Sequence, residues 1–200
     1  YFARERFKTI LLTFPYDQTL LSYNVEIDQH LPKSFLEWDR PVDHIALRPL
    51  IADPERAFDG GPYAAAADRL LLLTSEFQAM LKALYDNDYV LVADDLFLTD
   101  NGVFHKFKIP EGKKPLVLVF DSFHLATTRY LSGTVEKLAL DPAGKVVGAM
   151  TDEAGETVFR EGSDAISILE QFIADYPDFS YNGAKATIAV LGQYGLFGYA

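Results

Sequence analysis

The 200-residue chain is 49% hydrophobic and 14% aromatic, which is enough for one main globular unit with a sizeable core. Its 29 acidic residues outnumber 18 Lys and Arg, and the net charge of -11 argues against a nucleic-acid partner and against binding to an anionic membrane surface. Absence of cysteine excludes disulfides, thiolate metal sites and cysteine nucleophiles within these residues. No apolar run approaches the roughly 20 residues that a membrane span needs.

Residues 1–40 are predicted to form an irregular lead-in, because two periodicities are mixed there. Phe7, Ile10 and Leu11 have helical spacing, whereas residues 20–27 alternate as a strand does. The chain opens without Met and without the residue order of a signal peptide, and it stops after a glycine-rich apolar stretch. We therefore expect sequence upstream, and a domain over 41–200 that is incomplete at its C-terminus.

The middle of the chain predicts alternating strands and helices. A strand over 41–51 and a long loop precede a helix over 74–87, which begins with a capping residue at Thr74. A short buried strand follows at 89–92, and the acidic pair Asp94-Asp95 suits helix N-capping better than metal binding. A lid-like loop over 99–114 completes this part.

Residues 115–124 (Pro-Leu-Val-Leu-Val-Phe-Asp-Ser-Phe-His) predict a strand buried on both faces that ends at Asp121. Parallel strands of α/β proteins present their chemistry at the carboxyl end, so Asp121 is the first candidate for a functional residue. It acts either as a general base or as an acid that caps a turn or pairs with Arg48.

The last third predicts an antiparallel meander, then a helix and a strand. Turn residues at 141–145 and 152–155 separate alternating segments, which indicates a three-stranded meander over about 131–161, inserted in an α/β frame. A capped helix over 163–175 and a buried strand over 184–191 follow.

Several of these segments resemble the polysaccharide deacetylases, carbohydrate esterases with a NodB-like fold, and in particular a surface-associated branch from Gram-positive bacteria. The resemblance extends from about residue 43 to 199. Its motifs are 44–51, 76–92, 109–121, 176–185 (Tyr-Pro-Asp-Phe-Ser-Tyr-Asn-Gly-Ala-Lys) and 191–199 (Leu-Gly-Gln-Tyr-Gly-Leu-Phe-Gly-Tyr).

The resemblance implies a distorted or partial (β/α) barrel that removes acetyl groups from envelope or extracellular glycan. It also implies a zinc-like divalent metal, with Asp121 as general base taking the proton of a metal-activated water. By the same resemblance, the protein is expected at the cell envelope or outside the cell. Oligomeric state is left open.

The chain departs from the family motif at the metal site. Ser122 stands where the family has a metal-binding Asp, and Arg48 stands where many relatives have a His. The family's H-x-x-x-H is absent, and His124 is a candidate substitute ligand or proton carrier, although such a residue more often has a packing role. No metal ligand set is therefore predicted within these residues.

Two functions remain open at this point. One is acetyl hydrolysis completed by residues beyond Ala200; the other is an inactive homologue that binds glycan or a partner protein. Aromatic side chains of 176–199 would line a sugar-binding cleft in either case, although a core position is expected for most of them.

Overall fold

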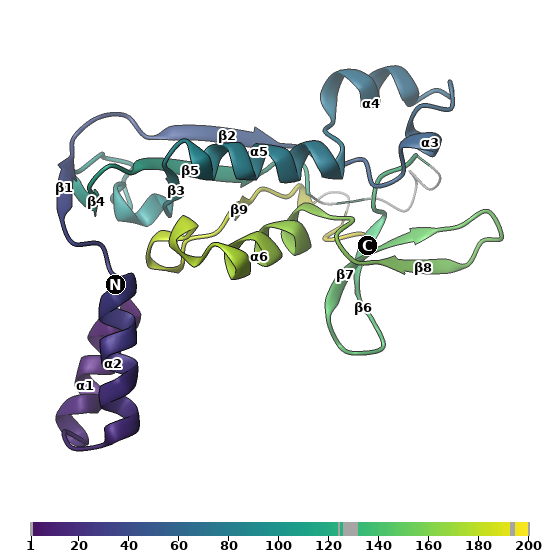
Figure 1. The fold of residues 1–200 in the computed structure, drawn as a ribbon. Helices are drawn as coiled ribbons and strands as arrows, with labels where there is room; N and C mark the ends of the chain where they lie inside the picture. The colour runs from purple at the N-terminus through teal and green to yellow at the C-terminus, as the bar shows by residue number, and fades with distance from the viewer. Residues whose placement is uncertain (1, 124, 126–131, 193–194, 200) are drawn as a thin grey trace.

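The computed structural model describes residues 2–123, 125, 132–192 and 195–199. Three parts are distinct in Figure 1: a helical hairpin at the N-terminus, a central parallel sheet with helices beside it, and an antiparallel meander. Within these ranges the parallel sheet is open rather than closed into a barrel. No helix in the described ranges is both long and apolar enough for a membrane span.

The N-terminal segment is regular, which corrects the expectation of an irregular lead-in. Helix α1 covers Phe2–Thr13 and helix α2 covers Gln18–His30. Asp17 caps α2, and its carboxylate accepts from the backbone N–H groups of Thr19 (2.9 Å) and Leu20 (3.0 Å). The strand-like alternation of residues 20–27 does not produce a strand, because those residues lie inside a capped helix.

Strands β1 (Phe35–Trp38) and β4 (Phe107–Pro110) form a two-stranded antiparallel ribbon. The partners are about 70 residues apart in sequence, with Phe35 opposite Pro110 and Trp38 opposite Phe107. The lid-like loop predicted over 99–114 thus contains a paired strand and the first residue of another.

The central sheet is wholly parallel. Strand β5 (Lys114–Phe120) lies between β2 (Asp43–Leu47) on one side and, on the other, β3 (Tyr89–Leu91) followed by β9 (Thr187–Ile188). The strands predicted around 43–47, 89–91 and 115–120 are confirmed. The strand predicted over 184–191 is reduced to the exposed pair of β9, so its predicted burial is wrong.

Alternation along β5 divides its side chains between two faces. Leu116, Leu118 and Phe120 join the main core, formed with helices α5 (Thr74–Asp86) and α6 (Ala165–Asp175). Val117 and Val119 face a smaller cluster supplied by β1, β4 and the short 3₁₀ turns Asp94–Leu96 (η1) and Tyr181–Gly183 (η4).

The second face of the sheet is covered over the first half of β5 but not over β2, where His44 is exposed opposite the buried Val117. Ala46 and Val119 are opposite each other in the register, yet Ala46 is exposed and Val119 is half-buried. Parallel sheets are usually covered on both faces. The uncovered area therefore runs along β2 and reaches the carboxyl end of β5.

The helix predicted over 74–87 is confirmed, with one correction at its start. Thr74 is the first residue of α5 rather than its N-cap, and the Glu76 side chain accepts from the N–H of Leu73 at 2.8 Å. Two further helices, α3 (Pro54–Ala57) and α4 (Ala64–Leu70), occupy the segment that was expected to be a long loop.

The predicted meander is present as β6 (Lys137–Leu140), β7 (Val146–Thr151) and β8 (Thr157–Arg160), each antiparallel to the next. Asp141 and Asp152 build the two turns in the same way. Each carboxylate accepts from the backbone N–H groups two and four residues further on, at 2.8–2.9 Å.

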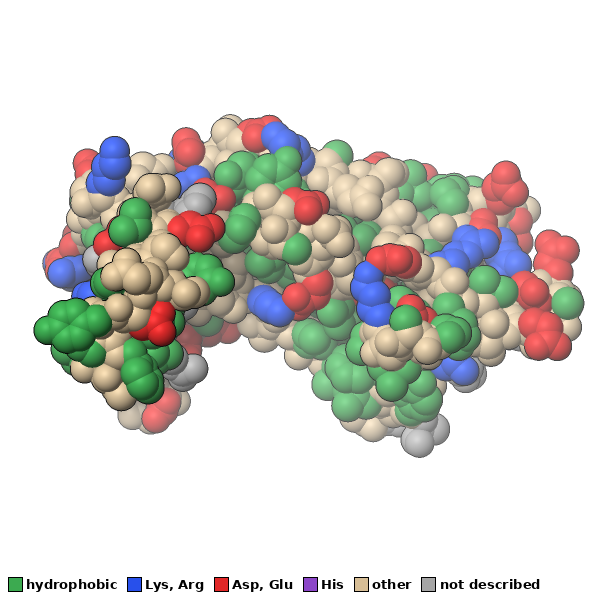
Figure 2. Space-filling view, turned by 60° about the horizontal axis from the view of Figure 1, so that its bottom comes forward, with side chains coloured by type: hydrophobic (Ala, Val, Ile, Leu, Met, Phe, Trp, Pro, Cys, Tyr) green, Lys and Arg blue, Asp and Glu red, His purple; other side chains and the backbone are tan. Residues whose placement is uncertain are grey.

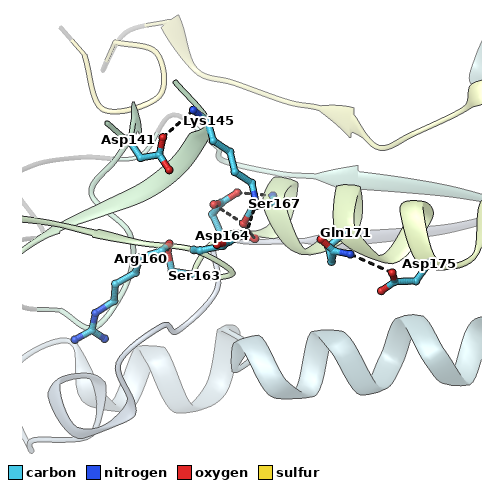
Figure 3. Close-up of polar contacts among 9 residues, drawn as sticks. Asp141, Lys145, Arg160, Ser163, Asp164, Ser167, Gln171 and Asp175 are labelled. Atoms are coloured by element: carbon cyan, nitrogen blue, oxygen red, sulfur yellow. Dashed lines mark hydrogen bonds and ion pairs between the residues drawn. The ribbon is translucent and has the colours of Figure 1, made fainter. Parts of the chain in front are cut away.

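Helix α6 begins directly after the meander, at a buried cap shown in Figure 3. The Asp164 carboxylate accepts from Ser167, from its N–H at 2.9 Å and from its hydroxyl at 2.8 Å, and the Ser163 hydroxyl donates to the Arg160 carbonyl at 2.6 Å. These bonds fix the helix start predicted at 163–164.

Tyr85 joins the end of α5 to the 3₁₀ turn Pro177–Phe179 (η3), because its hydroxyl donates to Asp178 Oδ1 at 3.0 Å. Burial, and then this hydrogen bond, raise the pKa of Tyr85. A raised tyrosine pKa stabilises the fold below the unfolded value of about 10, and this stabilisation is lost as pH rises through the folded value.

We therefore expect Tyr85→Phe to flatten the loss of stability as pH rises above about 10. Urea unfolding across this pH range measures it. Tyr16→Phe, at a side chain that is 87% exposed, serves as the control and should keep the wild-type slope. An unchanged slope in Tyr85→Phe would contradict the expectation.

Candidate functional site

The predicted residues Arg48, Asp121 and Ser122 meet at the carboxyl ends of β2 and β5, a region called here the carboxyl edge. Leu47 is opposite Phe120 in the register, and the Asp121 N–H continues the ladder by donating to the Leu47 carbonyl at 2.7 Å. Arg48 therefore follows β2 directly beside Asp121, on strands that run about 4.8 Å apart.

The turn that carries Asp121 is held from both sides. Ala189 donates to the Phe120 carbonyl at 2.9 Å and accepts from the Phe123 N–H at 3.1 Å, so β9 fixes the side away from β2. The Phe123 side chain is buried and stacks on Phe120, with ring centroids 5.7 Å apart. Asp121 and Ser122 thus protrude between two anchored phenylalanines.

Ser122 has a φ of 56°, in the left-handed region that non-glycine residues rarely adopt. Such a conformation costs about 1–2 kcal/mol and persists only where neighbouring contacts impose it. Here the contacts of Phe120 and Phe123 do so. The left-handed residue ends β5 abruptly and leaves the carboxylate of Asp121 at the edge of the sheet.

Both charged side chains of the carboxyl edge are available to a ligand. In the described part of the chain, no hydrogen bond or ion pair engages the carboxylate of half-buried Asp121 or the guanidinium of exposed Arg48. The ion pair considered between them is thus not formed. By strand alternation both belong to the face of Ala46 and Val119, which is the uncovered face.

The donor set of the carboxyl edge does not fit a divalent metal. It offers one carboxylate (Asp121), one neutral hydroxyl (Ser122) and a guanidinium (Arg48), which repels cations and has no lone pair to donate. Zinc sites use three or four His, Cys, Asp or Glu ligands. Among the described residues no group of three such side chains lies together.

The histidine candidate cannot be placed, because His124 lies outside the described residues. His44 lies on β2 and is exposed; its Nδ1 is 2.9 Å from the Val42 carbonyl, and its ring and that of Phe97 meet edge to face. It therefore lies nearer the amino end of the sheet than Arg48 does.

The aromatic residues proposed for a sugar-binding cleft are divided by the structure. Phe179 is fully buried in the main core, and Tyr176 packs against Tyr85 with ring centroids 4.6 Å apart. Tyr199 is exposed, whereas Tyr181 and Phe197 are half-buried in the two core clusters. Tyr194 lies outside the described residues.

Two buried oxygens near the end of β3 were not predicted as a pair. Asp94 Oδ1 and Asn182 Oδ1 are enclosed without a hydrogen-bond partner, among the residues that the structure describes. A parallel bridge between Leu91 and Ser180 brings their segments side by side. The N-capping role expected for Asp94 is wrong, because Ala93 is the N-cap residue of η1 and no side chain caps it. An Asp soon after a buried strand is the sequence signal that could have identified this position.

The protein is therefore a mixed α/β protein with an open parallel sheet. Charged side chains lie at the carboxyl edge of that sheet. Comparison with protein-family models, with curated proteins and with solved structures found no match. A functional conclusion for this chain therefore depends on the geometry of its own residues and on the motifs in its sequence.

Proposed function

We propose that the carboxyl edge is the glycan site of a polysaccharide deacetylase-like protein, and that Asp121 is the general base for hydrolysis of an acetyl group. The observation that carries this proposal is the unengaged carboxylate of Asp121, delivered by the central parallel strand to an uncovered part of the sheet. The sequence motifs, which resemble that family, supply the substrate class and an envelope or extracellular location.

The side chains present divide the hydrolysis into two roles. Asp121 accepts a proton from water as the water oxygen attacks the acetyl carbonyl carbon, and the Arg48 guanidinium stabilises the resulting oxyanion. Collapse of the intermediate breaks the bond between acetyl carbon and sugar nitrogen or oxygen, the leaving group takes the proton, and acetate is released. Because the donor set does not fit a divalent metal, no step is assigned to one.

Asp121→Asn is expected to lower kcat/KM for acetate release from acetylated chitooligosaccharides or peptidoglycan fragments by about 100- to 10,000-fold. Asn keeps the shape of the side chain but cannot take the proton. Asp39→Asn, in the exposed loop between β1 and β2, is the matched control and should retain activity. Acetate release that persists in Asp121→Asn would overturn the proposed role of this residue.

The second candidate function is glycan binding without hydrolysis. The placement of Arg48 beside Asp121, with Ser122 in place of a second acid, favours it, since these groups suit hydrogen bonding to sugar better than metal binding. Calorimetric titration separates the two functions. Binding that Arg48→Ala weakens, with no acetate released by the wild type in buffer with or without zinc, supports the second candidate and contradicts the first.

A further inference from the structure

We propose that Phe197 is a positioning residue for Asp121. Phe197 lies in a tight turn over residues 196–199, called here the 196–199 turn, and its ring contacts the ring of Phe123 with centroids 6.5 Å apart and planes at 71°. Phe123 in turn holds the segment that carries the acid. This inference rests on the proposed function, in which Asp121 is the general base.

The 196–199 turn has a backbone that a phenylalanine rarely adopts. Leu196 and Tyr199 exchange two backbone hydrogen bonds, of 2.8 and 3.0 Å, and Phe197 and Gly198 between them have φ angles of 54° and 86°. Two positive φ angles in a two-residue loop define a type I′ turn. The first central position of this turn favours Asn, Asp or Gly, so Phe197 is strained there.

The 196–199 turn is anchored to the meander through its backbone. The Phe197 carbonyl accepts from the Leu138 N–H of β6 at 3.1 Å, and an added Cβ on Gly198 would lie 2.6 Å from Lys137 Cα. Figure 1 shows this end of the chain beside the meander. Because β6 also pairs with β7, the anchor is part of a formed sheet. We therefore expect the turn to form without the Phe197 ring.

Backbone strain is concentrated around Phe123. Of the five non-glycine residues with positive φ in the described ranges, Ser122 and Leu125 flank Phe123 in sequence and Phe197 contacts its ring. Strained residues of this kind persist only where surrounding contacts impose them, and they are frequent at functional sites. Phe123 is 1% exposed and stacks on Phe120, so Phe197 braces it from outside the central sheet.

This brace bears directly on the carboxylate of Asp121. The hydrogen bond from its N–H to the Leu47 carbonyl holds the backbone on the side of β5, whereas the other side continues through Ser122 to Phe123. Without the Phe197 ring, Phe123 is free to shift and Ser122 to leave the left-handed region. A displacement of about 1 Å is enough to lower a catalysed rate about 100-fold.

Phe197→Asn is the decisive variant, because Asn suits the first central position of a type I′ turn and carries no ring. We expect the 196–199 turn to remain, with the Leu138 amide hydrogen exchanging as in the wild type, while the amide hydrogens of Asp121 and Phe123 exchange at least about 10-fold faster. For acetate release from acetylated chitooligosaccharides, kcat should fall about 100-fold with KM unchanged, since only the base has moved.

A rescue variant and two controls accompany this test. Phe197→Tyr restores a ring and should restore the wild-type amide exchange and kcat. Leu196→Ala shortens a 45% exposed side chain of the same turn and should leave both unchanged. Leu12→Ala, at an 83% exposed side chain, is the distant control on the N-terminal hairpin, where Figure 2 shows hydrophobic side chains gathered at the surface.

Failure of the proposed function and failure of this inference give different results. A wild type that releases no acetate overturns the proposed function, and amide exchange at Asp121 and Phe123 still decides whether Phe197 holds them. Unchanged exchange there in Phe197→Asn overturns the inference, and so does an unchanged kcat in a protein whose wild type releases acetate. Faster exchange throughout β5 also overturns it, because the ring would then stabilise the core as a whole.

Discussion

Phe120→Ala is expected to lower the free energy of unfolding by about 3–5 kcal/mol. Phe120 ends the central strand, is 1% exposed, and contacts Phe77 of α5 and Phe123 of the following turn, with ring centroids 6.0 and 5.7 Å apart. Truncation leaves a cavity where the sheet, a helix and the turn meet. Urea unfolding followed by circular dichroism measures the change.

Val119→Ala is the control for this prediction, because Val119 is the adjacent residue on the opposite, partly uncovered face. Its half-buried side chain loses little packing, so we expect a cost of about 1 kcal/mol. Equal costs at the two positions would contradict the description of a sheet with one fully covered face. Asp121 belongs to the same partly uncovered face as Val119, so the same comparison tests whether a ligand can reach Asp121.

Gly133→Ala is expected to destabilise the fold by about 2–5 kcal/mol. Gly133 has a φ of 80°, and an added Cβ would lie 2.8 Å from both the Cβ and the backbone N of Ala57. The Gly133 carbonyl also accepts from the N–H groups of Ala52 (2.8 Å) and Asp53 (3.0 Å). The substitution would therefore force apart the segment after β2 and the start of the meander.

Gly144→Ala isolates the backbone contribution to this cost. Gly144 has the same φ of 80°, in the turn between β6 and β7, but no atom lies within 4 Å of its added Cβ. We expect only the left-handed penalty of about 1–2 kcal/mol there. If the two alanine variants unfold at the same urea concentration, close packing at Gly133 is not the cause of its cost.

Local features of the fold could be predicted from the sequence. The helix at Thr74–Asp86, the turns at Asp141 and Asp152 and the buried strand that ends at Phe120 all follow from periodicity and capping chemistry. These signals are local because each is contained within a few residues. The same strand end located Asp121, and sequence motifs pointed to Arg48 and Ser122.

Pairing over long distances was decided by the tertiary structure alone. Residues 20–27 alternate like a strand, but packing against α1 and the Asp17 cap make them a helix. Neither the β1–β4 ribbon nor the placement of Arg48 beside Asp121 follows from any local pattern, since the partners are about 70 residues apart in both cases. The sequence by itself determined the helix at Thr74–Asp86, the turns of the meander and the acid that ends the central strand. The residues next to that acid were decided by the packing of distant segments. Apolar strand and helix faces pack together wherever they can bury each other, and this packing is not encoded in any short stretch of sequence.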